Sequence, residues 1–342
     1  MPIDAVQRSI HIRRKKNEVV FKNIDRLWHL SSGAKSHQDI LNGLHPWQGS
    51  ISLKFENTLP WFLALFGLMQ VFSLIIAPHN FWLQCNFALG FGMLFWAYLI
   101  YEQERSINDV IEYLEERVLT HKYHLHFQQQ PQHISMPLNP RQFIGNLKRL
   151  FPVFERGSLR NDISRYASTT WLDENEQEHQ VLLFEYHYVD EIKTIDKNGN
   201  TVKLIEQHKN LWGAFVFDVS VQGLAISTSR RPFPSPYRHP WHSSDIRTNQ
   251  RLKFYGTDPM QMAKQLSPGF VLRLGQFFQY REGDLIFHPQ QRVLCYLGPH
   301  DIFNAPERKQ NIQDISALRG HLRTFKLVEL EKLQTDLIQF LK

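Results

Sequence analysis

Cysteine is scarce in this chain of 342 residues, which contains only Cys85 and Cys295. Two cysteines exclude a disulfide framework and a thiolate metal site, so the composition fits a reducing compartment. Residues 1–25 also lack an apolar core of about seven residues and a small-residue cleavage site. No cleavable signal peptide is therefore expected.

The motifs that mark common enzyme classes are missing as well. The sequence contains no Gly-rich phosphate loop, no G-x-S-x-G, no H-E-x-x-H and no C-x-x-C. Acid and base groups would have to be gathered by the fold, and each candidate is more simply a turn, cap or surface residue. Those candidates are Asp190, Glu191, Asp218, Asp245 and Asp258. No catalytic residue is assigned, and no cofactor is expected.

Charge is absent from two long apolar runs, residues 59–77 and 81–101, which contain no Asp, Glu, Lys or Arg. A helix needs about 20 residues, at a rise of 1.5 Å each, to cross the roughly 30 Å hydrocarbon core of a bilayer. Both runs approach that length, and only Pro78, His79 and Asn80 connect them. The sequence therefore predicts a transmembrane helical hairpin at residues 59–101, and a buried hairpin in a globular protein is the alternative.

Two further features of these runs suit a membrane hairpin. Gly67, Gly90 and Gly92 would let the two helix backbones approach closely. Trp61 and Tyr101 lie near the predicted ends, where amphipathic rings favour the membrane interface.

Positive charge is distributed in a way that predicts an orientation. Residues 1–58 carry several Lys and Arg, and so does the segment after residue 101, whereas the connector carries none. By the positive-inside rule, both termini face the cytoplasm of a bacterial inner membrane. The net charge of +6 comes from scattered bases, with one tight run at residues 13–16, so nucleic acid is not expected as a partner.

The rest of the chain divides by its periodicity. Residues 102–127 keep a helical apolar stripe and are expected to extend the second membrane helix as a stalk. Residues 128–140 are rich in proline and glutamine and are expected to form a linker. Residues 141–342 are expected to form one α+β domain, so the predicted fold class is α+β, with a transmembrane hairpin ahead of an antiparallel-sheet domain covered by helices.

Several local signals place elements in that domain. Asn198-Gly199 between two alternating runs predicts a β-hairpin, and Asp258-Pro259 and Ser267-Pro268 predict helix starts. Residues 312–341 are expected to form a C-terminal amphipathic helix that covers the sheet. Its apolar stripe is expected to pack on the strand residues Leu182, Phe184, Tyr186 and Tyr188.

The sequence offers one set of candidate metal ligands, His121, His124 and His126. A metal site needs three or four ligands held by neighbouring groups, and no carboxylate or cysteine set accompanies these histidines. Solvated or linker histidines are the simpler interpretation, so no bound metal is predicted.

Prolines, rings and arginines gather at residues 230–244 and form a candidate interaction loop. Extended proline-rich segments with rings and arginines suit binding to a partner, and a rigid connecting loop is the alternative. The candidate contact residues are Arg230, Arg231, Phe233, Tyr237 and Trp241.

Three short segments carry a resemblance to known proteins: NLWGAFVF at residues 210–217, NQRLKFYGTDP at residues 249–259 and LSPGF at residues 266–270. Their order and spacing resemble an uncharacterised bacterial family of membrane-anchored proteins, a domain of unknown function. The resemblance covers roughly residues 151–303 and the hairpin arrangement. It implies two N-terminal transmembrane helices and a cytoplasmic domain, and it brings no catalytic residues.

Two functions stay open at the level of sequence. The leading hypothesis is an integral inner-membrane protein that presents its α+β domain for binding to a protein or to the lipid bilayer. The alternative is a membrane-tethered, hydrolase-like enzyme whose carboxylates and histidines are assembled by the fold. A pocket with convergent acids and histidines would favour the enzyme, and an exposed apolar patch would favour the binding protein.

Overall fold

The computed structural model describes residues 15–76, 81–131, 143–195, 202–229, 233–308 and 312–341. The chain forms two compact units and passes between them repeatedly. Unit 1 comprises Met1–Lys122 and Glu307–Phe325, and unit 2 comprises Tyr123–Pro306 and Lys326–Lys342.

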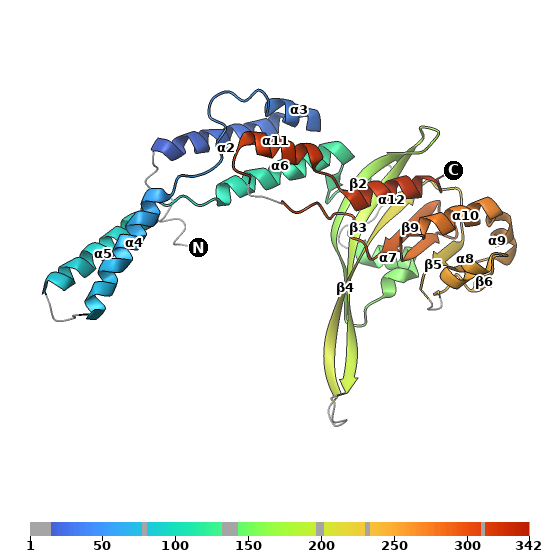
Figure 1. The fold of residues 1–342 in the computed structure, drawn as a ribbon. Helices are drawn as coiled ribbons and strands as arrows, with labels where there is room; N and C mark the ends of the chain where they lie inside the picture. The colour runs from blue at the N-terminus through green and yellow to red at the C-terminus, as the bar shows by residue number, and fades with distance from the viewer. Residues whose placement is uncertain are drawn as a thin grey trace. The chain divides into compact units, whose positions relative to one another are not determined.

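Unit 1 contains a small helical bundle (Figure 1). Its members are α2 (Lys15–Gly33), α3 (His37–Gly43), α6 (Arg105–Tyr123) and α11 (Ile315–Thr324). They share one apolar core, in which α6 contributes its predicted stripe: Ile107, Val110, Ile111, Leu114 and Val118. A capping box fixes the start of α3, because the Ser36 hydroxyl accepts from Asp39 N at 3.1 Å and the Asp39 carboxylate accepts from Ser36 N at 3.0 Å.

Unit 1 also contains the apolar hairpin, which we define as α4 (Thr58–Ile76) and α5 (Phe81–Ile100). The two helices lie against each other at Gly67 and Gly90. A Cβ atom built on either glycine would lie 2.8 Å from the other's carbonyl oxygen, so only glycine fits at both positions. The expected close approach is confirmed at these two residues and not at Gly92, which has open space around it.

The structure contradicts the predicted transmembrane hairpin. Within the side chains that the structure describes, no helix combines the length and apolarity needed to cross a membrane. Three expectations are therefore wrong. They are the transmembrane part of the fold class, the function as an integral inner-membrane protein, and the localisation with two spans and cytoplasmic termini.

The predicted stalk is also different in the structure. Helix α5 ends at Ile100 and α6 begins at Arg105, so the two are separate helices rather than one continuous rod. The expected apolar stripe on α6 is present, and α2, α3 and α11 cover it.

Unit 2 is built on one sheet, in which nine strands of the described chain pair in the order β1-β2-β3-β4-β9-β8-β5-β7-β6. Every pairing is antiparallel. The strands are β1 (His126–Phe127), β2 (Arg160–Leu172), β3 (Glu178–Ile195), β4 (Val202–Phe217), β5 (Leu224–Ser227), β6 (His239–Trp241), β7 (Lys253–Gly256), β8 (Asp284–Phe287) and β9 (Val293–Gly298). The helical elements are α7 (Phe143–Leu150), the 3-10 helix η2 (Pro152–Glu155), α8 (Ile246–Arg251), α9 (Pro259–Gln265), α10 (Pro268–Phe277) and α12 (Val328–Ile338).

The local signals of this unit are confirmed where the structure describes the chain, and Asn198-Gly199 itself lies outside the described residues. Strands β3 and β4 pair in register from Ile195↔Val202 onward, and their paired ends extend beyond the neighbouring strands (Figure 1). Asp258 caps α9 by accepting from Met260 N at 2.9 Å, and Ser267 caps α10 by accepting from Phe270 N at 3.3 Å. Both helices carry proline in the first turn, where no N–H partner is needed.

The two faces of the sheet have different covers. One face carries Phe184 and Tyr186, which pack on Phe154 of η2 with ring centroids 5.5 and 5.1 Å away. The opposite face carries Tyr296 and Phe287, which pack on α10. The residues Leu182, Phe184, Tyr186 and Tyr188 therefore face α7 and η2, and not the C-terminal helix.

The C-terminal segment is two helices that belong to different units. Leu318 and Leu322 of α11 enter the core of unit 1, whereas Leu330, Leu333 and Leu337 of α12 are buried in unit 2. The expected single amphipathic helix is thus divided at residues 325–327.

Candidate functional site

The three candidate metal ligands do not form one group. His121 lies on α6 in unit 1, while His124 and His126 lie in unit 2. His121 is near Asp39, whose pKa is lowered chiefly by the Ser36 hydroxyl and the Lys35 amide, with a smaller contribution from His121. Among the described residues, no three His, Cys, Asp or Glu side chains gather as metal ligands.

The rings of the candidate interaction loop pack inward. Tyr237 is fully buried and donates its hydroxyl to the Phe287 carbonyl at 2.9 Å. Phe233 meets the Tyr237 ring edge-on at 5.6 Å, and Trp241 meets Phe254 edge-on at 5.4 Å. Arg230 and Arg231 lie outside the described residues. Partner binding by this loop stays a prediction.

The candidate acids of the sequence are dispersed over unit 2. Asp245 and Asp258 are helix caps, and the Thr248 hydroxyl is the largest cause of the lowered pKa of Asp245. Asp190 pairs with Lys209 at 3.6 Å, and Asp218 occupies a turn with φ of 63°. Each of these four thus has a local structural role, and Glu191 is exposed on β3.

A buried polar cluster of unit 2 was not predicted. Asp284 accepts from Ser227 Oγ at 2.5 Å and from Arg156 Nη2 at 2.5 Å, and its side chain is 3% exposed. Both carboxylate oxygens are engaged, so this ion pair holds the end of η2 against the sheet.

The apolar hairpin exposes a large number of apolar side chains. Its outward side chains are large and solvent-accessible: Leu59, Trp61, Phe62, Leu65, Phe66, Leu68, Met69 and Phe72 in α4, and Leu89, Phe91, Phe95, Trp96 and Tyr98 in α5. The less exposed positions of α4, such as Ala64, Gly67 and Val71, are those that face α5. Exposed apolar patches of this extent mark interaction sites.

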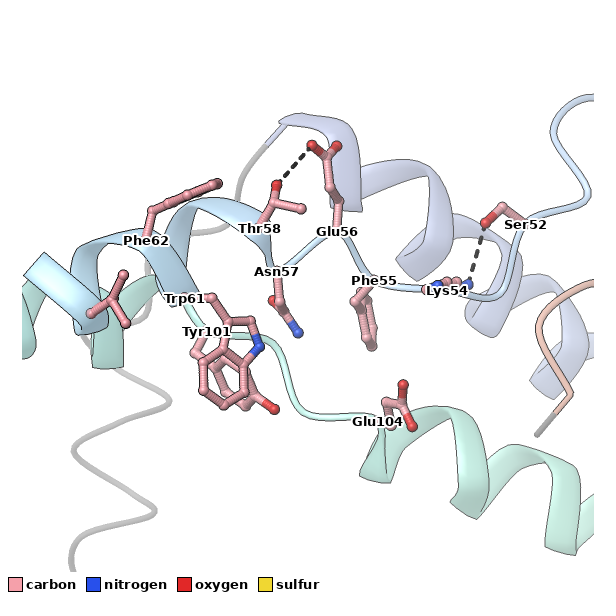
Figure 2. A pocket seen from close by; sticks show the side chains of 11 residues that line it. Ser52, Lys54, Phe55, Glu56, Asn57, Thr58, Trp61, Phe62, Tyr101 and Glu104 are labelled. Carbon is pink, nitrogen blue, oxygen red and sulfur yellow. Dashed lines mark hydrogen bonds between the residues drawn. The ribbon is translucent and has the colours of Figure 1, made fainter. Parts of the chain in front are cut away.

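A hollow of about 790 Å³ opens at the base of the apolar hairpin, and we call it the base hollow. Its polar wall is formed by Ser52, Lys54, Glu56, Asn57 and Glu104, and its apolar wall by Trp61, Phe62, Leu65 and Tyr101. Figure 2 shows Glu104, immediately before α6, reaching toward the segment that carries Lys54 and Phe55. The base hollow is therefore charged at one end and apolar at the other.

Asn57 links the two helices of the apolar hairpin at its base. Its amide donates to the Glu102 carbonyl at 2.7 Å and accepts from Glu102 N at 3.1 Å, which joins the start of α4 to the end of α5. Beside it, Trp61 and Tyr101 meet edge to face with centroids 6.4 Å apart. These contacts hold the apolar wall in a fixed place.

The polar wall is also held by local bonds. Lys54 N donates to Ser52 Oγ at 3.3 Å, and the Thr58 hydroxyl donates to Glu56 Oε1 at 3.3 Å. Glu56 N donates to Asn17 of α2 at 2.9 Å, which ties the segment to the helical bundle. The sequence does contain a signal for these residues, because Lys54, Glu56, Glu102 and Glu104 directly flank the charge-free runs.

No protein-family model, no curated protein and no solved structure matches this chain. The resemblance to the family of membrane-anchored bacterial proteins stays a prediction.

Proposed function

We propose that this protein binds the surface of lipid bilayers through the apolar hairpin. The observation that carries the proposal is the continuous apolar surface of α4 and α5, which has no Asp, Glu, Lys or Arg. Contact with water is unfavourable by about 25 cal/mol for each Å² of such surface. The acyl chains of a lipid bilayer can cover this apolar surface without having a complementary shape.

Two features favour lipid over a protein partner. A protein interface has an apolar centre and a polar rim, whereas the outward positions of α4 from Trp61 to Phe72 are apolar throughout. The aromatic side chains Trp61, Tyr98 and Tyr101 also gather at the base, where amphipathic rings suit the head-group level of a bilayer. Binding of this kind requires contact with acyl chains, and it does not require a helix to cross the bilayer.

Vesicle flotation with the full chain tests this proposal. The triple variant Phe62→Ser, Phe66→Ser, Met69→Ser removes side chains that are 60, 53 and 63% exposed, so the fold should tolerate it. Because each large apolar side chain contributes about 1.5–3 kcal/mol when covered, we expect the variant to lose flotation by at least 100-fold.

The matched control is Ile246→Ser, Met260→Ser, Leu272→Ser on unit 2, where the side chains are 71, 69 and 64% exposed. This control should float like the unchanged protein. Equal flotation of both triple variants would contradict the proposal. The proposal would also be contradicted if the hairpin variant kept its flotation and lost only self-association, measured by sedimentation. In that case a second copy of the chain, and not lipid, would cover the apolar hairpin.

A further inference from the structure

We propose that His187 and His208 form a surface site for Zn²⁺ or a similar divalent transition-metal ion. The two residues lie on adjacent strands of unit 2, β3 and β4. The Nε2 atom of His187 lies 3.1 Å from the Nδ1 atom of His208. The proposal is independent of lipid binding, because the apolar hairpin belongs to the other unit of the chain.

The register of the two strands brings both imidazoles to one face of the sheet. His187 is opposite Asn210, and Val189 is opposite His208, so the two histidines are diagonal neighbours. Long side chains in diagonal positions can touch across a strand pair. The two ring centroids are 5.3 Å apart, and neither side chain is buried. Both rings can therefore turn toward an ion from the solvent without disturbing the core.

The distance between the two ring nitrogens suits a shared metal ion. Zn²⁺–N bonds are about 2.0–2.1 Å long, so nitrogens 3.1 Å apart subtend about 95–102° at one ion. The 3.1 Å contact is a hydrogen bond with one proton between the nitrogens, and the ion would take the place of that proton. Each neutral imidazole then keeps its single proton on its other nitrogen, and the ion exchanges two of its water ligands for the two lone pairs.

Glu206 is placed to orient His208 for this role. Its Oε2 atom lies 3.6 Å from His208 Nε2. A carboxylate beside one ring nitrogen favours the tautomer that carries its proton there, which leaves Nδ1 to bind the ion. This is the arrangement in which many histidine ligands of zinc are held.

Neighbouring acids on the same face favour a cation. Glu191 lies directly opposite Glu206 in the strand pair. Like charges in directly opposite positions are destabilising, and a bound cation would relieve their repulsion. Asp162 lies directly opposite His187 on the other side, and its carboxylate pairs with Arg160 at 3.3 Å.

The choice of ion follows from the donor atoms. Two imidazole nitrogens suit zinc and its neighbours among the transition metals, whereas Mg²⁺ and Ca²⁺ prefer oxygen. The described residues supply two ligands here, and not three, so water would complete the coordination.

An ion at this site would join the two strands where they have the least support. The pairing of β4 with β9 starts only at Trp212, and the described pairing of β2 with β3 reaches only Val189. Beyond these points β3 and β4 form a two-stranded ribbon (Figure 1). Such ribbons are marginally stable by themselves. Binding of the ion should therefore stabilise the projecting ends of β3 and β4.

Isothermal titration calorimetry of the full chain with Zn²⁺ alone tests the site. Groups that only orient a metal ligand contribute about 10–100-fold to affinity, so loss of a ligand itself should cost at least about tenfold. We expect His187→Gln and His208→Gln each to weaken the tightest Zn²⁺ binding by that factor. The control His239→Gln removes an exposed histidine of the same unit and should bind Zn²⁺ like the unchanged chain. Equal Zn²⁺ affinity in all three variants would overturn the proposal.

Hydrogen exchange gives a second readout, which locates the bound ion. At a Zn²⁺ concentration of about 100 Kd, opening of the ribbon should be suppressed by up to about 100-fold if the open form does not bind the ion. The slower exchange should be found at residues 190–195 and 202–209 and should be absent in His208→Gln. Exchange of these residues that Zn²⁺ leaves unchanged would overturn the site, as would slower exchange that persists in both His187→Gln and His208→Gln.

Discussion

At the scale of single residues, His288 shows how one side chain fixes a turn of unit 2. Its Nδ1 accepts from Gln290 N at 3.2 Å and from Gln291 N at 2.9 Å, between the end of β8 and the start of β9. Its ring also meets Phe151 edge-on at 5.6 Å. An Nδ1 atom that accepts cannot carry a proton, so the turn requires the neutral imidazole.

This geometry predicts a pH dependence of stability. Burial lowers the pKa of His288 below its ordinary value of 6.5, so the unfolded chain takes up a proton more readily than the folded one. The contribution of His288 to the free energy of unfolding should be constant above pH 6.5 and should decline as the pH falls below that value. We expect His288→Gln to flatten that decline, measured as the change in unfolding free energy between pH 7.5 and 5.5. The exposed His239→Gln serves as the control, and an equal decline in both variants would contradict this account.

Single residues also show what sequence can and cannot reveal about the candidate site. Lys54 and Glu104 are visible as charges beside charge-free runs, but nothing in their spacing indicates that they line one hollow. That proximity depends on the separation of α5 from α6 and on the Asn57–Glu102 bonds. The buried Asp284 is similarly unpredictable, because its partners Arg156 and Ser227 are distant in the chain.

At the scale of elements, the apolar hairpin depends on two glycines for its close packing. Replacing Gly67 by valine would place carbon atoms against the Gly90 carbonyl and Leu94. We expect Gly67→Val to destabilise the hairpin by about 1–3 kcal/mol, as overpacking usually does.

The measurement is disulfide crosslinking between Ala64→Cys and Ala97→Cys, which line one hollow, in a Cys85→Ser background. The yield should fall with Gly67→Val and stay unchanged with Gly92→Val, because Gly92 has open space around it. A similar fall in both variants would mean that β-branching in the helix, and not the close approach, is responsible.

Elements with local signals were predictable, and those set by distant contacts were not. The antiparallel pairing of β3 with β4 and the caps of α9 and α10 follow from a few adjacent residues. The division of the C-terminal segment has no such signal, since neither Pro nor Gly occurs at residues 325–327. An alternating strand likewise shows that it has two faces, but not which helix covers each face. The membrane prediction relied on charge-free run length, on glycines and on terminal aromatic residues, and within the described residues no helix is long and apolar enough to cross a membrane.

At the scale of the whole molecule, each unit needs a piece of the C-terminal segment. Leu318 of α11 is fully buried in unit 1, and Leu337 of α12 is fully buried in unit 2. Truncation of a buried leucine to alanine costs about 2–5 kcal/mol because a cavity remains.

We therefore expect Leu318→Ala and Leu337→Ala to destabilise different units. Hydrogen exchange followed by mass spectrometry should show faster exchange in α2, α3 and α6 for Leu318→Ala, and in α10 and β9 for Leu337→Ala. Each variant is the control for the other. If both variants accelerated exchange in the same elements, the two units would unfold as one.

The path of the chain has a consequence for its synthesis on the ribosome. The core of unit 1 contains Ile312, Ile315, Leu318 and Leu322, which are translated roughly 200 residues after the apolar hairpin. At about 5–20 residues per second, that gap corresponds to about 10–40 s. During this time α2, α3 and α6 exist as a nascent bundle that lacks one of its four helices, while the whole β-sheet is being made. Unit 1 begins first and is completed almost last, so its assembly must wait for the translation of α11.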